Sequence, residues 1–365
     1  MKLVNTRHKA NLEERTREKM HSAIYLEKYA PTATGSVNWS RVELSFEFHD
    51  MTEADDPFDD IEDGDFRAAN SRKRNFDRIM SSAKLVFDHQ HRTHHYTVVI
   101  LGTMARIVRW DRSGALYTER FNYKTETTLA KFLYCYTRLD AIDRGYDPSA
   151  VPIAASSPHY DLMRSRANNP HLDEEGNEID RDIREAFADS IDDHQWRFKL
   201  TVDTVDGPRD FIVGEPSFSS SSMAGRGTRG YIAIDVADPA GPFVYLKDVW
   251  RIDDPRMQQE GSILSSLNIA KVPYIPTLVC HGDVPEQATV TDKVWRKLHA
   301  QESAGEADDE AVDPCPLKAH RHYRMVVREV AEPLDSFTNG RELIKMLVHI
   351  LRGEHNYYML ATLPN

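Results

Sequence analysis

The sequence of 365 residues has few cysteines and no long apolar run. Its three cysteines, Cys135, Cys280 and Cys315, are far apart and form no CxxC pair, so we expect neither a disulfide framework nor a zinc site. No stretch of about 18 apolar residues occurs, which argues against a transmembrane helix. The first residues also lack the apolar core of a secretory signal. These absences predict an intracellular protein that does not enter a membrane.

The sequence also lacks an excess of basic residues. Lysine and arginine total 46, whereas aspartate and glutamate total 58, which gives a net charge of −12. General nucleic-acid binding depends on clustered basic residues that neutralise phosphates, so nucleic acid is not an expected partner. Apolar residues make up 40% of the chain, enough for a sizeable core. The acidic residues concentrate in segments that we expect to be solvated inserts, at 52–65, 173–193 and 301–313.

The spacing of apolar residues predicts an N-terminal α+β domain over residues 1–148. A helix is expected at 71–88 and another at 127–139. Between them, three β-rich runs are separated by turn residues, which predicts an antiparallel meander with strands at 96–101, 105–110 and 115–121. Residues 149–193 are rich in Ser, Pro and Asp, so we expect a partly disordered linker there, with a short helix near 180–191.

The rest of the chain, residues 194–365, is predicted to form a second domain. We expect an antiparallel sheet of about five strands, with one helix inserted after a pair of strands. The sequence favours helices at 257–268 and 339–352, and strands at 196–202, 209–213, 230–236, 243–250, 276–280 and 322–330.

Three glycines of this domain, Gly225, Gly227 and Gly230, match the pattern GxGxxG. In a dinucleotide-binding βαβ unit a helix must open at such glycines, but here an alternating β-branched run follows at 231–236. The glycines therefore belong to a hairpin between strands, and a Rossmann site is excluded. Protein kinases use glycines between two strands to cover the phosphates of ATP.

The residues that follow fit the same kinase pattern. Ile232 is the aliphatic residue two positions after the third glycine, and Lys247 is the only basic residue between 230 and 251. A lysine at this place on the next strand pairs with the nucleotide phosphates. Glu260, at the start of the next predicted helix, is the candidate partner of Lys247. The alternative is that Glu260 is a solvated first-turn acid, which the helix dipole favours.

The predicted strand at 322–330 would lead into a hinge, where the backbone at Glu329 and Val330 would hold the adenine ring. Together these features resemble the fungal-type protein kinase family. Further blocks that are similar to this family cover roughly residues 70–355: Gln90-His-Arg-Thr-His94, Arg109-Trp-Asp-Arg-Ser-Gly114, Arg144-Gly-Tyr-Asp-Pro148, Arg226-Gly-Thr-Arg-Gly-Tyr231 and Leu246-Lys-Asp-Val-Trp-Arg251. The resemblance implies an N-terminal α+β region followed by a kinase fold. It also implies Mg-ATP as cofactor and transfer of phosphate to Ser or Thr of a protein whose identity the sequence does not give.

The sequence departs from the kinase pattern in two ways. Tyr245 stands where the pattern V-A-I-K has a small residue, so its side chain could crowd the adenine pocket. No H-R-D or D-F-G tripeptide occurs in the 365 residues, although phosphoryl transfer needs the catalytic-loop and metal-binding Asp residues of these motifs. We therefore expect a kinase-like N-lobe with its hinge and first C-lobe helix, lacking the C-lobe and without turnover of its own. His281-Gly-Asp283 is interpreted as a loop.

Three other interpretations stay open. A non-catalytic, pseudokinase-like binding module would self-associate or bind a partner through the apolar underside of an isolated N-lobe. A nuclease-like role for residues 1–148 is a weaker alternative, because no carboxylate pair with metal-ligand spacing supports it. His89, His91, His94 and His95 could seat a metal, but a polar junction between helix and strand is the favoured interpretation, and no metal site is predicted.

Overall fold

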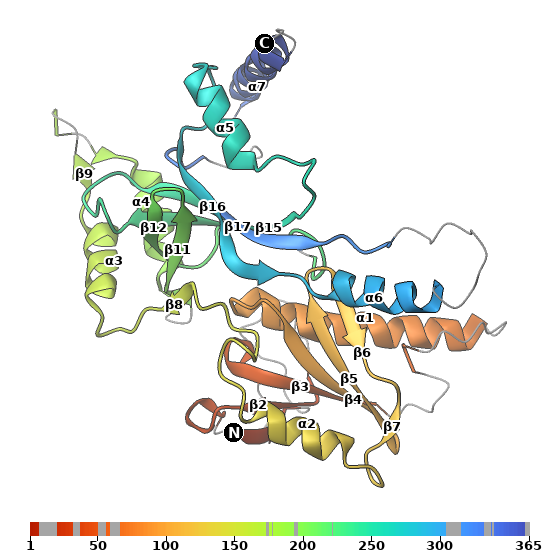
Figure 1. Cartoon of the computed structure of the whole chain (residues 1–365). Coiled ribbons are helices and arrows are strands. Elements are labelled where there is room, and N and C mark those ends of the chain that lie inside the picture. Colours follow the sequence, from red (N-terminus) through yellow and green to blue (C-terminus); the bar gives the residue numbers. More distant parts are fainter. Residues whose placement is uncertain are drawn as a thin grey trace. The chain divides into compact units, whose positions relative to one another are not determined.

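A computed structural model of the chain describes residues 1–6, 20–31, 37–49, 56–58, 66–172, 175–176, 178–192, 196–220, 222–303, 315–331, 337 and 339–361. The chain divides into two compact units (Figure 1). Unit 1 comprises residues 1–148, 221–227 and 288–320, and unit 2 comprises residues 149–220, 228–287 and 321–365. In the part of the chain that is described, no helix combines the length and the apolar character needed to cross a membrane. The predicted α+β class is confirmed.

Unit 1 contains a seven-stranded sheet in the order β1-β2-β3-β4-β5-β6, with β7 paired to β5. The meander β4-β5-β6 is antiparallel, as predicted, whereas β3 and β4 are parallel. Parallel neighbours need a crossover, and the long helix α1 lies between them in the chain. The elements are β1 (Lys2–Asn5), β2 (Ser22–Tyr25), β3 (Val42–His49), α1 (Phe66–His89), β4 (His95–Leu101), β5 (Met104–Asp111), β6 (Gly114–Tyr117), β7 (Phe121–Asn122) and α2 (Thr128–Tyr136), with short 3-10 turns at Glu27–Tyr29 and Trp39–Arg41.

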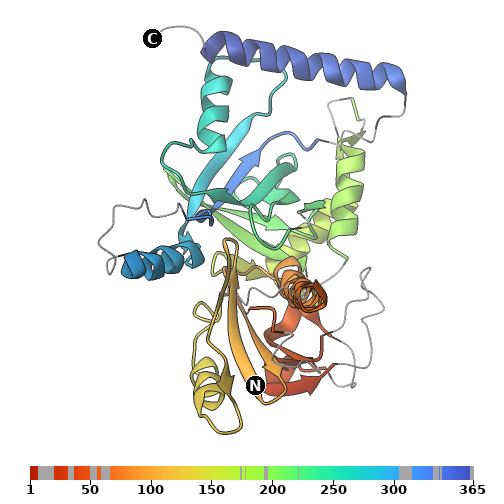
Figure 2. The same cartoon turned by 90° about the vertical axis from the view of Figure 1, so that its right-hand side faces the viewer.

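Alternate residues of β4 pack into two different hydrophobic clusters, because successive residues of a strand point to opposite faces of the sheet. Val99 and Leu101 pack in one cluster with Phe87 of α1. Val98 and Ile100 pack in another with Tyr136 of α2. The two helices therefore cover opposite faces of the sheet (Figure 2). This arrangement explains why all four residues at 98–101 of β4 are apolar.

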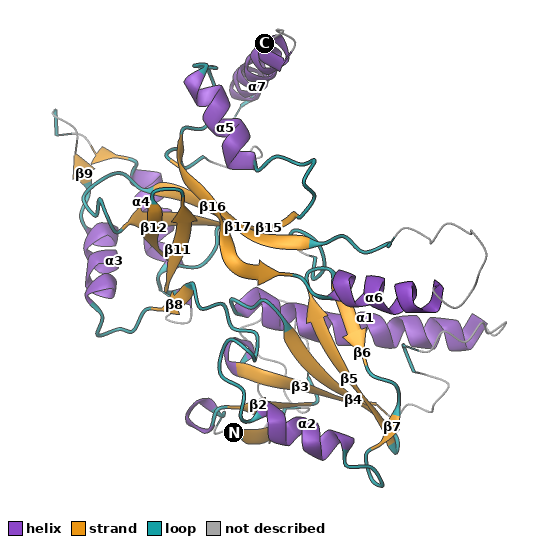
Figure 3. Ribbon diagram, in the orientation of Figure 1, coloured by secondary structure: helices purple, strands orange, loops and turns teal. Residues whose placement is uncertain are grey.

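Unit 2 contains an eight-stranded sheet in the order β16-β17-β15-β14-β12-β11-β8, with β13 also paired to β14 (Figure 3). The sheet is larger than the five strands expected. The elements are β8 (Ala150–Pro152), α3 (Pro158–Asn168), β9 (His171–Leu172), β10 (Glu178–Ile179), α4 (Arg181–Ser190), β11 (Phe198–Thr204), β12 (Gly207–Val213), β13 (Phe218–Ser219), β14 (Arg229–Asp235), β15 (Val244–Ile252), α5 (Glu260–Ile269), β16 (Leu278–Ala288), β17 (His320–Val327) and α7 (Gly340–Ala361).

The segment expected to be a linker, 149–193, instead contributes strands and helices to unit 2. Met163 of α3 and Phe187 of α4 are fully buried against Ile212 and Ile232 of the sheet. A stretch of low average hydropathy can form such helices because only one stripe of each helix needs to be apolar. Helices α3 and α4 therefore cover part of one face of the sheet.

Two segments of the expected second domain belong to unit 1, where Asp111, Arg112 and Ser113 hold them. Arg112 Nη1 donates to the carbonyl of Met223 at 2.7 Å, and the backbone N–H of Gly225 donates to the Arg112 carbonyl at 2.7 Å. Asp111 Oδ2 accepts the backbone N–H of residues 290 and 291 at 2.9 and 3.1 Å, where helix α6 (Thr291–Ser303) begins. Ser113 Oγ donates to the carbonyl of Lys318 at 2.5 Å. The block 109–114 thus has a structural role. The acidic inserts 52–65 and 301–313 are mostly outside the described residues.

Candidate functional site

The candidate site in unit 2 is built on two neighbouring strands, β14 and β15. Their antiparallel register sets Ile232 opposite Tyr245 and Gly230 opposite Lys247. Because residues 245 and 247 are two positions apart, both side chains leave β15 on the same face. The sheet thereby brings an aliphatic, an aromatic and a cationic side chain to one surface.

Helix α5 supplies the carboxylate that Lys247 was predicted to bind. Lys247 Nζ donates to both Oε1 and Oε2 of Glu260 at 2.7 Å. The side chain of Lys247 is 24% exposed and that of Glu260 is 43% exposed, so the pair lies at a solvent-accessible edge. The predicted contact is therefore present, while Glu260 also lies in the first turn of α5 and is partly solvated, as the alternative describes. A pair that water can reach is open to a third, anionic group.

A cavity of about 580 Å³ adjoins this ion pair, a volume within the range of small-molecule sites. Lys247 and Glu260 line it together with two more residues that the sequence predicted, Glu329 and Val330. Its apolar wall includes Ile183, Ala186, Ile232, Tyr245, Met325 and Val327. The structure thus brings five of the eight predicted site residues around one cavity: Ile232, Lys247, Glu260, Glu329 and Val330.

The segment that was predicted to be a hinge lines this cavity at residues 329–331. The carboxylate of Glu329 is engaged elsewhere, because it accepts the backbone N–H of Thr277 at 2.6 Å and the Thr277 hydroxyl at 2.7 Å. This contact ties the end of β17 to the start of β16. Residues 329–331 follow the end of β17 at Val327 and so lie outside the strand. Residues 332–336 lie outside the described part.

The other three predicted residues do not line the cavity. Gly225 and Gly227 belong to unit 1, and a Cβ at Gly227, whose φ is +47°, would lie 2.4 Å from Arg112 Cζ. Gly230 lies within β14, where a Cβ would be 1.7 Å from Tyr245 Oη. Gly227 is thus explained by its close packing against Arg112, Gly225 by its φ of +101°, which favours glycine, and Gly230 by the room that it leaves for Tyr245.

Tyr245 was expected to crowd the adenine pocket. Its ring lies over Gly230 and forms part of the cavity wall, and burial raises the pKa of its hydroxyl. The cavity keeps a volume of about 580 Å³ with this side chain in place. Tyr245 therefore shapes the cavity without filling it.

Asp248 and Trp250, from the same block as Lys247, have a structural role. Asp248 Oδ1 accepts Arg324 Nε at 2.9 Å and lies 2.6 Å from His322 Nε2. The indole of Trp250 stacks on the His322 ring, with centroids 4.8 Å apart. These buried contacts join β15 to β17 and hold the strand that carries Lys247.

His281-Gly282-Asp283 is not the loop that we expected, because these residues lie within strand β16. A Cβ on Gly282 would be 1.5 Å from the carbonyl oxygen of Asp203, so only glycine fits there. Asp283 forms a bidentate pair with Arg251, with two contacts of 2.7 Å. The glycine that broke the strand pattern in the sequence thus marks a close approach of two backbones.

The four histidines between α1 and β4 are held by the protein itself. His89 Nδ1 lies 2.8 Å from the carbonyl of Leu85, and His95 Nε2 lies 2.7 Å from Ser45 Oγ. Across the described ranges, no three or more His, Cys, Asp or Glu side chains are grouped so that they could hold a metal ion.

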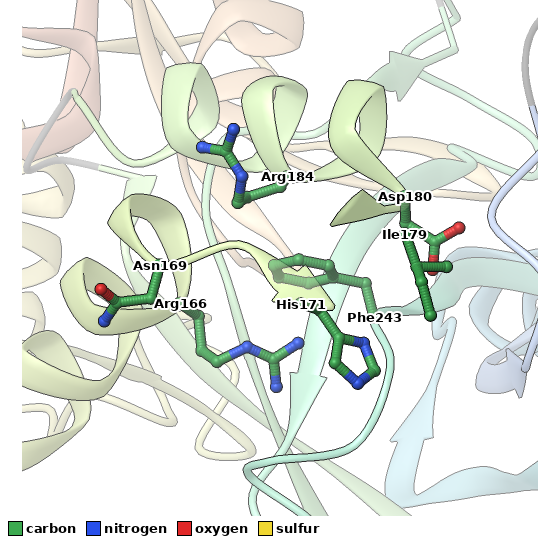
Figure 4. A pocket seen from close by; sticks show the side chains of 7 residues that line it. All are labelled: Arg166, Asn169, His171, Ile179, Asp180, Arg184 and Phe243. Atoms are coloured by element: carbon green, nitrogen blue, oxygen red, sulfur yellow. The ribbon is translucent and has the colours of Figure 1, made fainter. Parts of the chain in front are cut away.

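A second cavity, between α3, α4 and Phe243, is much smaller (Figure 4). Its volume of about 10 Å³ is room for one water molecule at most. Arg166 at its rim donates to two backbone carbonyls at 2.6 and 2.7 Å, and Arg184 donates to Glu178 Oε1 at 2.6 Å. This cavity is too small for a ligand such as a nucleotide.

The wall formed by α4 is the part of the site that the sequence analysis missed. Asp182, Ile183 and Ala186 line the large cavity, yet they fall in the segment taken for a linker. The spacing of Ile183 and Phe187, one helical turn apart, is the signal that could have identified this helix as packed.

The comparisons with known proteins agree with this geometry. A family model described as fungal protein kinase matches residues 49–362. The chain therefore belongs to the fungal protein kinase family. No curated protein and no solved structure gives a match.

Proposed function

We propose that the large cavity of unit 2 is an ATP site of the protein-kinase type. The observation that carries the proposal is the ion pair between Lys247 and Glu260 at the rim of a cavity with apolar walls. In kinases, a lysine of this kind binds the α- and β-phosphates and is oriented by the glutamate of the following helix. Membership of the fungal protein kinase family supports the same interpretation.

The residues of the cavity fit a nucleotide. Ile232, Met325 and Val327 offer an apolar surface to an adenine ring, and the peptide groups at Glu329 and Val330 offer hydrogen bonds to its edge. Lys247 Nζ would hold the phosphates by its positive charge, while Glu260 keeps the lysine side chain extended. ATP, when bound, would supply the phosphoryl group for a Ser or Thr hydroxyl of a protein substrate.

The 365 residues contain neither H-R-D nor D-F-G. The Asp residues of these motifs orient the attacking hydroxyl and bind Mg²⁺. We therefore propose that this chain binds ATP but, by itself, transfers no phosphate.

Measurement of ATP affinity by isothermal titration calorimetry tests the site. Lys247→Ala should weaken ATP binding at least about tenfold, since it removes the charge that meets the phosphates. Lys199→Ala is the matched control, because Lys199 also pairs with a carboxylate, Asp210 at 2.6 Å, but does not line the cavity. Equal losses in both variants, or no ATP binding by the wild type, would refute the proposed site. Radiolabelled phosphate transfer above the Lys247→Ala background would refute the proposed lack of turnover.

The second candidate is a non-catalytic binding module that associates with a second copy of itself. Helix α7 favours it, because an apolar stripe with spacing i, i+3, i+4, i+7 is exposed: Ile344, Leu347, Val348 and Leu351 are 63%, 44%, 37% and 62% exposed. Analytical ultracentrifugation should then show a concentration-dependent dimer that Leu347→Asp dissociates. A monomer at all concentrations would rule this candidate out.

A further inference from the structure

The start of helix α5 is held by side chains from other strands. The first N–H groups of any helix lack partners within it, and they are usually satisfied by the side chain of the N-cap residue. Here the N-cap residue is Gln259, and its side chain does not cap the helix. Instead, the N–H of Gly261 donates to the hydroxyl oxygen of Tyr323 at 2.8 Å.

Tyr323 is well suited to fix this point. It lies on β17 and is only 1% exposed, so its hydroxyl has a fixed position in the sheet. Burial raises the pKa of this hydroxyl further above its ordinary value, so it stays a neutral phenol. Gly261 also lets the start of α5 lie against β16, since a Cβ at that position would be 2.2 Å from Cγ of His281.

Asp283 binds Gln259, the residue directly before Glu260. Gln259 Nε2 donates to Asp283 Oδ2 at 3.0 Å. Asp283 is itself held by the two contacts with Arg251. Glu260 thus lies between two residues whose contacts are made with β15, β16 and β17, the part of the sheet next to its own ion pair.

We propose that Tyr323 is a positioning residue for the phosphate end of the site, with Asp283 as its support. The cap determines where α5 begins, and Glu260 is the residue directly before the capped N–H. The Tyr323 hydroxyl therefore sets the place of the Glu260 carboxylate, and through it the place of Lys247 Nζ. The expected effect of Tyr323 on ligand binding rests on the proposed ATP site. Its expected effect on the ion pair between Lys247 and Glu260 does not depend on ATP.

The first test measures the ion pair directly. Lys247 Nζ is acylated with an N-hydroxysuccinimide ester of acetate, and the rate is followed by mass spectrometry relative to the exposed Lys271. Tyr323→Phe keeps the ring but removes the cap, and we expect the relative rate at Lys247 to rise about fivefold, the shift that loss of one helix cap produces. Glu260→Gln gives the rate for a lysine without its partner, and Tyr160→Phe in α3 is the matched control for loss of a tyrosine hydroxyl.

The second test separates phosphate from adenine binding. Tyr323→Phe should weaken the binding of ATP about fivefold and leave the binding of adenosine unchanged, because adenosine has no phosphate to meet Lys247. A general loosening of the fold would weaken both ligands together. Asp283→Asn should raise the acylation rate at Lys247 and weaken ATP binding, as Tyr323→Phe does. If Tyr323→Phe does not fold, the results for Asp283→Asn test the positioning role instead.

An unchanged acylation rate at Lys247 in both Tyr323→Phe and Asp283→Asn would overturn the positioning role. If the wild type binds no ATP, the proposed function fails, yet the acylation rates still decide whether Tyr323 holds the ion pair. An equal loss of ATP and adenosine affinity would also overturn the proposal, because it would show a merely structural effect.

Discussion

Replacement of Arg112 by alanine should release residues 222–225 from unit 1. Arg112 is 4% exposed, and its guanidinium donates to the carbonyl of Met223 at 2.7 Å. It also lies over the ring of Phe87, 4.7 Å from the centroid. The backbone N–H of Gly225 donates to the backbone carbonyl of residue 112. This hydrogen bond can still form in Arg112→Ala, because the substitution keeps the carbonyl. Exchange of this N–H therefore reports whether the segment opens.

The cost follows mainly from these two contacts, which alanine cannot make; the longer bond from Arg112 Nη1 to the carbonyl of Ser222, at 3.2 Å, is lost as well. A hydrogen bond from a charged group contributes about 2 kcal/mol, and a cation–π contact of this kind contributes about 1 kcal/mol. The segment should therefore open more easily by about 3 kcal/mol, which corresponds to a factor of about 100 in the opening equilibrium. Most of the cluster that Met223 joins, Trp110 and Phe87 included, lies outside the segment, so the segment should open locally without unfolding of unit 1.

Hydrogen–deuterium exchange of the peptide that contains Gly225 measures this factor. Arg138→Ala is the control, since Arg138 is an exposed arginine that also lies over an aromatic ring. If protection of Gly225 in Arg112→Ala stays within about threefold of the wild type, the burial of Met223 alone holds the segment and our reasoning about Arg112 is wrong.

Two further predictions concern stability. Gly282→Ala places a Cβ 1.5 Å from a backbone oxygen that cannot move freely, so it should lower the free energy of unfolding by about 3 kcal/mol or more. Gly340→Ala is the control, because it has open space around it and should leave the thermal melting temperature nearly unchanged. Equal melting temperatures of the two variants would contradict this prediction. Burial, with Arg109 nearby, lowers the pKa of His94 from 6.5 to about 4 in the folded chain. The unfolded chain then binds the proton first as the pH falls, so stability present above pH 6.5 is lost as the pH falls towards 4, by about 2 kcal/mol between pH 7 and 5. Urea titrations should show a smaller loss for His94→Gln, and an identical pH dependence would show that other groups cause it.

The local elements of the chain could be predicted because their signals are local. The meander from β4 to β6 follows from alternating residues separated by turns, and α5 follows from its apolar stripe after Lys247. The ion pair between Lys247 and Glu260 could be predicted as well, because a strand and the helix after it lie close together. Helix α4 was expected as a short helix near 180–191, but α3 and the packing of both helices on the sheet were missed, since their apolar stripes are short and are surrounded by charged residues.

Local patterns in the amino-acid sequence were enough to predict Ile232, Lys247, Glu260 and the segment at Glu329 and Val330, all of which line the cavity. The folded chain was needed to show that the three glycines do not line the cavity, because Arg112, which packs against Gly227, is more than 100 positions away along the chain and no local pattern links the two residues. The same holds for Tyr323, whose hydroxyl caps a helix that begins 63 residues earlier. Periodicity records which side of an element is buried, whereas contacts between distant elements arise only when the chain has folded. For this reason the family resemblance and the ion pair could be found in the sequence, but the residues that hold the ion pair in place could not.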